Sequence, residues 1–123
     1  MSLFKLQVKT KNQTYPIIIG DGSANRLKKI FKENAINFNQ CLVVIDQNVP
    51  KKIIKKILSF LLKKNTTIHY FKSSEKNKNQ KNVDKITSIL LKKNFNRNDC
   101  LISIGGGITG DISSFAASIF KRG

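Results

Sequence analysis

Residue types that build disulfides, metal sites and membrane spans are scarce in this sequence. Its two cysteines, Cys41 and Cys100, each begin an apolar run and are not in C-x-x-C spacing. We therefore expect two small buried thiols, as is usual in cytoplasmic proteins. The single histidine, His69, lies inside an apolar run, and we interpret it as a structural strand residue because a metal site needs several converging ligands. No apolar run reaches the roughly 20 residues that span a bilayer, and no secretory pattern opens the chain. We expect a cytoplasmic protein without a membrane partner.

Acidic residues are also few: 7 against 23 lysines and arginines, for a formal net charge of +16. A basic surface of this size raises the possibility of a nucleic-acid-binding module, which would bind phosphates by counterion release. The lysines, however, are spread over every expected helix and do not form one stripe with interleaved aromatics. Together with abundant asparagine and isoleucine, this favours a general compositional bias. We expect no specific nucleic-acid partner.

The hydrophobic pattern predicts an α/β fold. Phe4, Leu6 and Val8 alternate with polar residues, as in a half-exposed strand, and a polar turn joins them to the apolar run 14–20, so an amino-terminal β-hairpin is expected. After it, apolar strand runs alternate with helical patterns, and the expected strands cover 41–46, 66–71 and 101–105. This order is typical of βαβ units. We predict one Rossmann-like, mostly parallel sheet flanked by helices.

The segment 101–111, LISIGGGITGD, is the most informative part of the chain. A buried strand runs into three glycines and then into a helix, and Gly105, Gly107 and Gly110 fit the G-x-G-x-x-G spacing. In this context backbone N–H groups and the positive end of the helix dipole converge where a phosphate can bind. A tight turn with nothing bound is the alternative reading.

Polar side chains follow the other two strands. Asp46 ends the 41–46 run, and a loop with Glu75 and Lys78 follows the 66–71 run. The carboxyl ends of parallel strands meet at one edge, where ligands of open α/β sheets bind. Carboxylates there can accept from ribose hydroxyls, while amides and lysine suit phosphates. Each acidic residue taken alone could equally be a solvated loop residue, and Asp111 could be a favourable charge in the first turn of its helix.

GGGITGD followed by SSFAASIFKRG resembles the G-G-G-x-x-G-D…F-A-A-x-x-x-R-G segment of the 3-dehydroquinate synthase family. YPIIIGDGS, VVIDQNVP, SSEKNKN and NRNDCLISIGGG occur in the family's order. The resemblance covers all 123 residues but only the amino-terminal part of the family's length. It therefore implies an incomplete NAD-binding domain over residues 1–123, truncated before the helical carboxyl-terminal domain that carries the family's metal ligands.

The resemblance also implies roles for individual residues. Arg122 matches an arginine that reaches the substrate's phosphate, from a neighbouring subunit in the family. Ser74 and Asn77 depart from the family's usual glycine and tyrosine, which leaves the conformation of their loop open. No catalytic or metal-binding residue is expected in this chain. The positions implied to contact NAD are Asp46, Gln47, Asn48, Glu75, Lys76, Asn77, Lys78, Gly106, Gly107, Ile108, Thr109, Gly110 and Asp111.

For the full-length enzyme, the resemblance implies the lyase activity that converts 3-deoxy-arabino-heptulosonate 7-phosphate to 3-dehydroquinate in the shikimate pathway. It implies NAD and a zinc or cobalt ion as cofactors, a phosphorylated sugar acid as substrate, and a homodimer. We expect the 123 residues alone to lack turnover. Another sugar-phosphate cyclase and a glycerol dehydrogenase-like NAD enzyme remain alternatives. A basic nucleic-acid-binding module is a third alternative.

Overall fold

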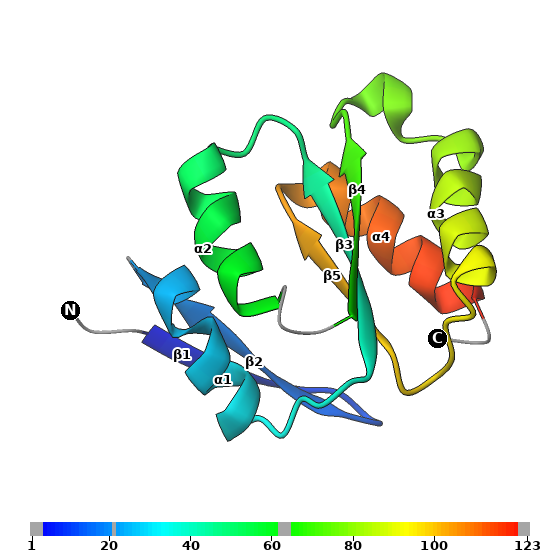
Figure 1. Cartoon of the computed structure of the whole chain (residues 1–123). Helices are drawn as coiled ribbons and strands as arrows, with labels where there is room; N and C mark the ends of the chain where they lie inside the picture. The colour runs from blue at the N-terminus through cyan, green and yellow to red at the C-terminus, as the bar shows by residue number, and fades with distance from the viewer. Residues whose placement is uncertain (1–3, 21, 62–64, 121–123) are drawn as a thin grey trace.

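The computed structural model describes residues 4–20, 22–61 and 65–120. At the amino end, β1 (Phe4–Lys9) and β2 (Thr14–Ile19) form the expected antiparallel hairpin, with Phe4 opposite Ile19. The hairpin is a separate two-stranded sheet, beside α1 and apart from the larger sheet (Figure 1). Its apolar row is exposed, with Phe4 at 60% and Ile19 at 54%. The expectation of a half-exposed first strand was therefore wrong, because no other described element covers this row.

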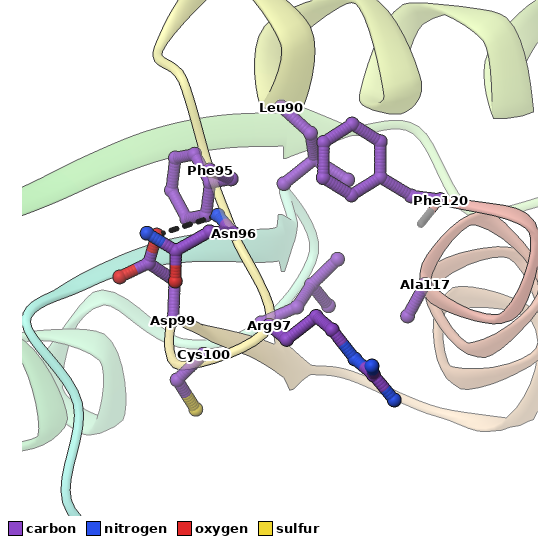
Figure 2. Close-up of a pocket in the computed structure, with 9 residues that line it drawn as sticks. Leu90, Phe95, Asn96, Arg97, Asp99, Cys100, Ala117 and Phe120 are labelled. Carbon is purple, nitrogen blue, oxygen red and sulfur yellow. Dashed lines mark hydrogen bonds between the residues drawn. The ribbon is translucent and has the colours of Figure 1, made fainter. Parts of the chain in front are cut away.

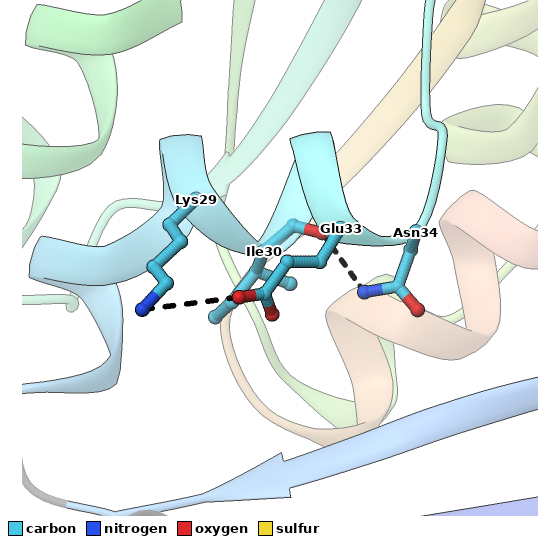
Figure 3. A network of polar contacts seen from close by, with 4 residues as sticks. All are labelled: Lys29, Ile30, Glu33 and Asn34. Carbon is cyan, nitrogen blue, oxygen red and sulfur yellow. Dashed lines mark hydrogen bonds and ion pairs between the residues drawn. The ribbon is translucent and has the colours of Figure 1, made fainter.

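A short helical segment follows the hairpin. A 3-10 turn over Ser23–Arg26 leads into α1 (Leu27–Glu33). Lys29 and Glu33 form an i,i+4 ion pair at 3.8 Å on its exposed face, and the side-chain amide of Asn34 donates to the Ile30 carbonyl at 2.8 Å (Figure 3). The backbone N–H of Asn34 donates to the same carbonyl at 3.1 Å, so this carbonyl accepts two hydrogen bonds at the end of the helix. Ala35, with a φ of 52°, then turns the chain away from the helix.

The larger sheet holds three parallel strands in the order β4-β3-β5. Their bounds are Gln40–Asp46 for β3, Asn65–Phe71 for β4 and Cys100–Ile104 for β5. The residues of β3 from 41 to 45 are all fully buried. A central strand covered on both faces has no place for polar side chains, which explains the uninterrupted apolar run at this position.

Helices cover the two faces of this sheet (Figure 1). Alternate residues of β3 point to opposite faces, so Leu42 and Val44 pack with α3 (Gln80–Lys92) and α4 (Gly107–Ile119). Cys41, Val43 and Ile45 pack on the other face with α2 (Lys51–Leu61). These three layers confirm the predicted α/β fold with its parallel sheet and amino-terminal hairpin. None of the described helices combines the length and the apolar character that a transmembrane span requires.

Candidate functional site

The carboxyl ends of β3 and β4 are joined side by side. Asp46 stands opposite Phe71 in the register, and the backbone N–H of Gln47 donates to the Phe71 carbonyl at 3.0 Å. The Asp46 carboxylate accepts from the N–H of Asn48 at 3.0 Å, and the Asp46 carbonyl accepts from Val49 at 3.0 Å. This turn holds the Asp46 side chain at the edge where the polar groups were expected to meet.

The glycine turn lies directly against Asp46. Gly105 follows the last residue of β5 and has a φ of +156°, and a Cβ added there would lie 2.9 Å from the Cβ of Asp46. The same Cβ would lie 2.8 Å from the Thr109 hydroxyl oxygen. Only glycine fits in the narrow space between the end of β3 and the first turn of α4. Gly105 is thus a structural part of the site, and the run of glycines is its sequence signal.

The first amides of α4 are available to a ligand. Gly106 is the N-cap, and the first helical bond runs from the N–H of Gly110 to the Gly106 carbonyl at 3.1 Å. The N–H groups of Gly107, Ile108 and Thr109 precede that bond, so the helix supplies them with no partner. A Cβ on Gly106 or Gly107 would meet nothing within 4 Å. The turn therefore has the form of an open anion cradle.

Thr109 is among the positions predicted to contact the cofactor. Its side chain is fully buried, and its hydroxyl has no hydrogen-bond partner among the described residues. In this arrangement only its backbone amide can face a ligand. Asp111 is likewise not in the first helical turn, so favourable charge at the very start of α4 does not explain it.

The two departures from the family pattern hold the loop after β4 together. The Ser74 hydroxyl accepts from the N–H of Asn77 at 3.2 Å and caps the short 3-10 helix η2 (Glu75–Asn77). The Asn77 side chain donates to the Lys72 carbonyl at 2.9 Å. The Asn77 side chain thus bonds within its own loop. Local hydrogen bonds hold this loop in place at the position where the family usually has a glycine.

Lys78 links this loop to α4. Its ammonium donates to the Asp111 carboxylate at 3.0 Å, across 33 positions of sequence. The hydrogen bond to Asp111, the charge of Asp111 and then the charge of Glu75 raise the pKa of Lys78. Lys78 therefore stays charged throughout the physiological range. This pair joins the loop after β4 to the helix that follows the glycine turn, and the contact of Gly105 joins that turn to Asp46.

A cavity of about 240 Å³ lies beside this ion pair, between the start of α3 and α4. Besides Lys78 and Asp111, it is lined by Asn79 and by Phe115, which is 47% exposed. Sequence reasoning missed both of these residues. Asn79 carried a readable signal, since an Asn before a helical pattern is a favoured N-cap, and its side chain caps α3 through the N–H of Asn82.

The other predicted residues fall in several places. Gln47 and Asn77 line a second hollow of about 260 Å³ at the end of β4, so the predicted set is not gathered in one cavity. Asn48, Glu75 and Lys76 are exposed around the edge, and Arg122 lies outside the described residues.

Within the described part of the chain, no group of three or more His, Cys, Asp or Glu residues could hold a metal. His69 lies on β4, where burial and then the charge of Lys85 lower its pKa.

Replacing Lys78 by Met is expected to leave the urea midpoint of unfolding close to that of the wild type. Its ion pair with Asp111 is solvent-exposed, and such pairs are screened and add little to stability. Lys76→Met, in the same loop, is the matched control. A large fall in the midpoint for Lys78→Met alone would show that the pair holds the fold together and does not merely border the site.

Comparison with known proteins agrees with the sequence resemblance. The family described as "3-dehydroquinate synthase N-terminal" matches residues 68–123. The chain is 63% identical to a 3-dehydroquinate synthase of Pelagibacter ubique and 33% identical to that of Syntrophotalea carbinolica, in both cases over its whole length. It spans only about a third of the length of these curated relatives, 33% and 34% respectively.

Among solved structures, a 2-deoxy-scyllo-inosose synthase complexed with carbaglucose-6-phosphate, NAD+ and Co2+ superposes with a TM-score of 0.83. The match covers 98% of this chain and 33% of that one, at 21% sequence identity. At that identity, the likeness establishes the fold. The sequence matches themselves show that this chain is similar to the amino-terminal part of 3-dehydroquinate synthases, through residues 68–123 to the family's amino-terminal model and over its whole length to curated members.

Proposed function

We propose that this chain is the NAD-binding part of a 3-dehydroquinate synthase. One observation carries the proposal: Asp46, the glycine turn and the Lys78–Asp111 pair converge at the carboxyl edge of one parallel sheet. That edge is where open α/β folds bind nucleotides. Identity of 63% to a curated synthase supports this enzyme over a different cyclase, since the cyclase structure shares only 21%.

Each part of the site suits a different part of a dinucleotide. The amides of Gly107, Ile108 and Thr109 donate to the pyrophosphate, aided by the positive end of α4. Asp46 already accepts the Asn48 N–H on one carboxylate oxygen, and its second oxygen accepts from a ribose hydroxyl. The Lys78 ammonium and the Asp111 carboxylate lie 3.0 Å apart. They form the side of the site next to α4, where they offer one positive and one negative charge. The bound nicotinamide supplies reversible hydride transfer.

The activity of the whole enzyme belongs to the same proposal. It is the lyase reaction that converts 3-deoxy-arabino-heptulosonate 7-phosphate to 3-dehydroquinate with loss of phosphate, in the cytoplasm, by a homodimer to which Arg122 contributes phosphate contact. Among the described residues, no group of three or more His, Cys, Asp or Glu side chains fits the family's zinc or cobalt ion. The 123 residues would accordingly bind NAD without turnover.

Gly107→Ala is expected to weaken NAD binding by about tenfold or more, equivalent to about 1.4 kcal/mol. The added methyl meets no protein atom within 4 Å, so the fold tolerates it, but it occupies the space through which a pyrophosphate approaches the amides. Calorimetric titration of the purified chain with NAD measures the effect, and urea unfolding verifies that stability is retained.

Ser114→Ala is the matched control, because Ser114 is an exposed residue later on the same helix. It should bind NAD as the wild type does. Equal affinity of Gly107→Ala and wild type would remove the glycine turn from the site. Absence of any NAD binding by a folded wild-type chain would overturn the proposal, and salt-steep binding of duplex DNA instead would support the basic-module alternative.

A further inference from the structure

The face of α3 that lies toward β4 carries a row of lysines. Lys81, Lys85 and Lys92 are separated by four and seven positions, so they share one face of the helix. All three line a hollow of about 440 Å³ between α3 and β4, which forms one edge of the parallel sheet (Figure 1). The lysines of the chain as a whole are spread out, but the fold brings those of α3 to one place.

His69 forms the β4 side of this hollow. Its register partner, Val44, packs on the side of α3 and α4, so the imidazole lies on the face of the sheet that α3 covers. His69 and Lys85 also line the hollow of about 260 Å³ at the end of β4, where Lys72 adds a further ammonium. The two hollows therefore adjoin, and we call them together the basic groove. Its basic side chains are His69, Lys72, Lys81, Lys85 and Lys92.

The described residues do not neutralise the charge of the basic groove. In that part of the chain, Lys29 and Lys78 are the lysines that form ion pairs, and neither lines the groove. The one described acidic residue that does, Asp84, already accepts from the side-chain amide of Gln80 at 2.9 Å. Four ammonium groups and one carboxylate thus leave an excess of positive charge, which favours an anionic ligand.

The cavity between α3, β5 and the end of α4 lacks these properties. It holds about 80 Å³ and is bordered by the rings of Phe95 and Phe120 (Figure 2). Arg97 is the one cation among its described lining residues, and its carboxylate, Asp99, accepts from the N–H of Asn96 at 2.8 Å. This cavity has neither the room nor the charge to hold a multivalent anion.

We propose that the basic groove binds a small multivalent phosphate anion, either a free triphosphate or the triphosphate group of a nucleotide. Lys81 and Lys85 lie about 6 Å apart along the helix axis, so one triphosphate can reach both ammonium groups. A hollow of 440 Å³ is within the range of about 300 to 1,000 Å³ that small-molecule sites occupy. No position expected to contact NAD lines that hollow, so the proposal does not rest on the proposed function.

The test is a calorimetric titration of the purified chain with inorganic triphosphate at fixed ionic strength, for which we expect one ion per chain. The double variant Lys81→Gln/Lys85→Gln should bind at least about tenfold more weakly, because charge-assisted hydrogen bonds to phosphate are lost. Lys52→Gln/Lys56→Gln is the matched control. It removes the same charge at the same spacing from exposed positions of α2, outside both hollows, and should bind as the wild type does.

Equal losses in the two double variants would mean that triphosphate is attracted by the diffuse charge of the chain, and would overturn the proposal. So would a loss of triphosphate binding in Gly107→Ala that the Lys81→Gln/Lys85→Gln variant does not share, because the anion would then lie at the glycine turn. Titration with adenosine triphosphate distinguishes the two sources. Tighter binding than that of inorganic triphosphate, with the same dependence on the two lysines, identifies a nucleotide, and equal or weaker binding identifies the free anion.

A pH series gives a second readout. Burial, and then the charge of Lys85, lower the pKa of His69 in the free chain, whereas a bound anion favours the imidazolium. Affinity for triphosphate should therefore rise as the pH falls from about 7.5 to about 5.5. The other titratable groups that face His69 are those of the four lysines and Asp84, and such groups ordinarily titrate outside this interval. The rise should be smaller in His69→Gln, where only the probe titrates, and an equal rise in both proteins would remove His69 from the site and contradict the proposal.

Discussion

Gly105→Ala is expected to lower the free energy of unfolding by about 2 to 4 kcal/mol. An added Cβ would lie 2.8 Å from the Thr109 hydroxyl oxygen and 2.9 Å from the Cβ of Asp46, closer than a Cβ approaches other heavy atoms in real structures. Neither neighbour is the free end of a flexible side chain, because Thr109 is fully buried and Asp46 is held by its own turn. Moreover, a φ of +156° is one that residues with a Cβ rarely adopt. Equilibrium unfolding in urea measures the loss.

Gly106→Ala is the matched control for this change. It lies next in the chain, has an extended backbone with φ −89° and ψ −163°, and a Cβ there would meet nothing within 4 Å. We expect a change within about 0.5 kcal/mol. If Gly105→Ala were as stable as Gly106→Ala, the glycine turn would not be wedged against β3, and the geometry of the proposed site would be wrong at its centre.

Leu90→Ala is expected to cost about 2 to 5 kcal/mol of unfolding free energy. Leu90 is 3% exposed and packs in the core that α3 and α4 share with β3. Removing three carbons there leaves a cavity, because the residues around it belong to the sheet and to two helices and cannot all close in. The same urea experiment measures the effect.

Leu91→Ala provides a control one residue further along the same helix. Leu91 is 64% exposed, so its truncation removes little buried surface and should change stability by less than about 0.5 kcal/mol. Equal losses for the two variants would mean that α3 does not present the Leu90 face to the core.

Periodicity in the sequence was sufficient to predict the parallel sheet. The run 41–45 is apolar at successive positions, which suits a strand covered on both faces. The helices with 3.6-residue periodicity supply those covers. The hairpin shows the limit of the same reasoning. Alternation in 4–8 established which side chains share a face, yet it carried no information about what covers that face, and Phe4 and Leu6 are exposed.

The sequence by itself determined the order of elements, the glycine turn before α4 and the family resemblance, because these depend on local backbone preferences and on motifs within a few residues. Only the tertiary structure decided that Gly105 touches Asp46, that Lys78 pairs with Asp111, and that Cys41 stands opposite Cys100. Each of these contacts joins residues more than 30 positions apart. Strand order and register, set by packing of the whole core, fix such distances, and no local pattern encodes them.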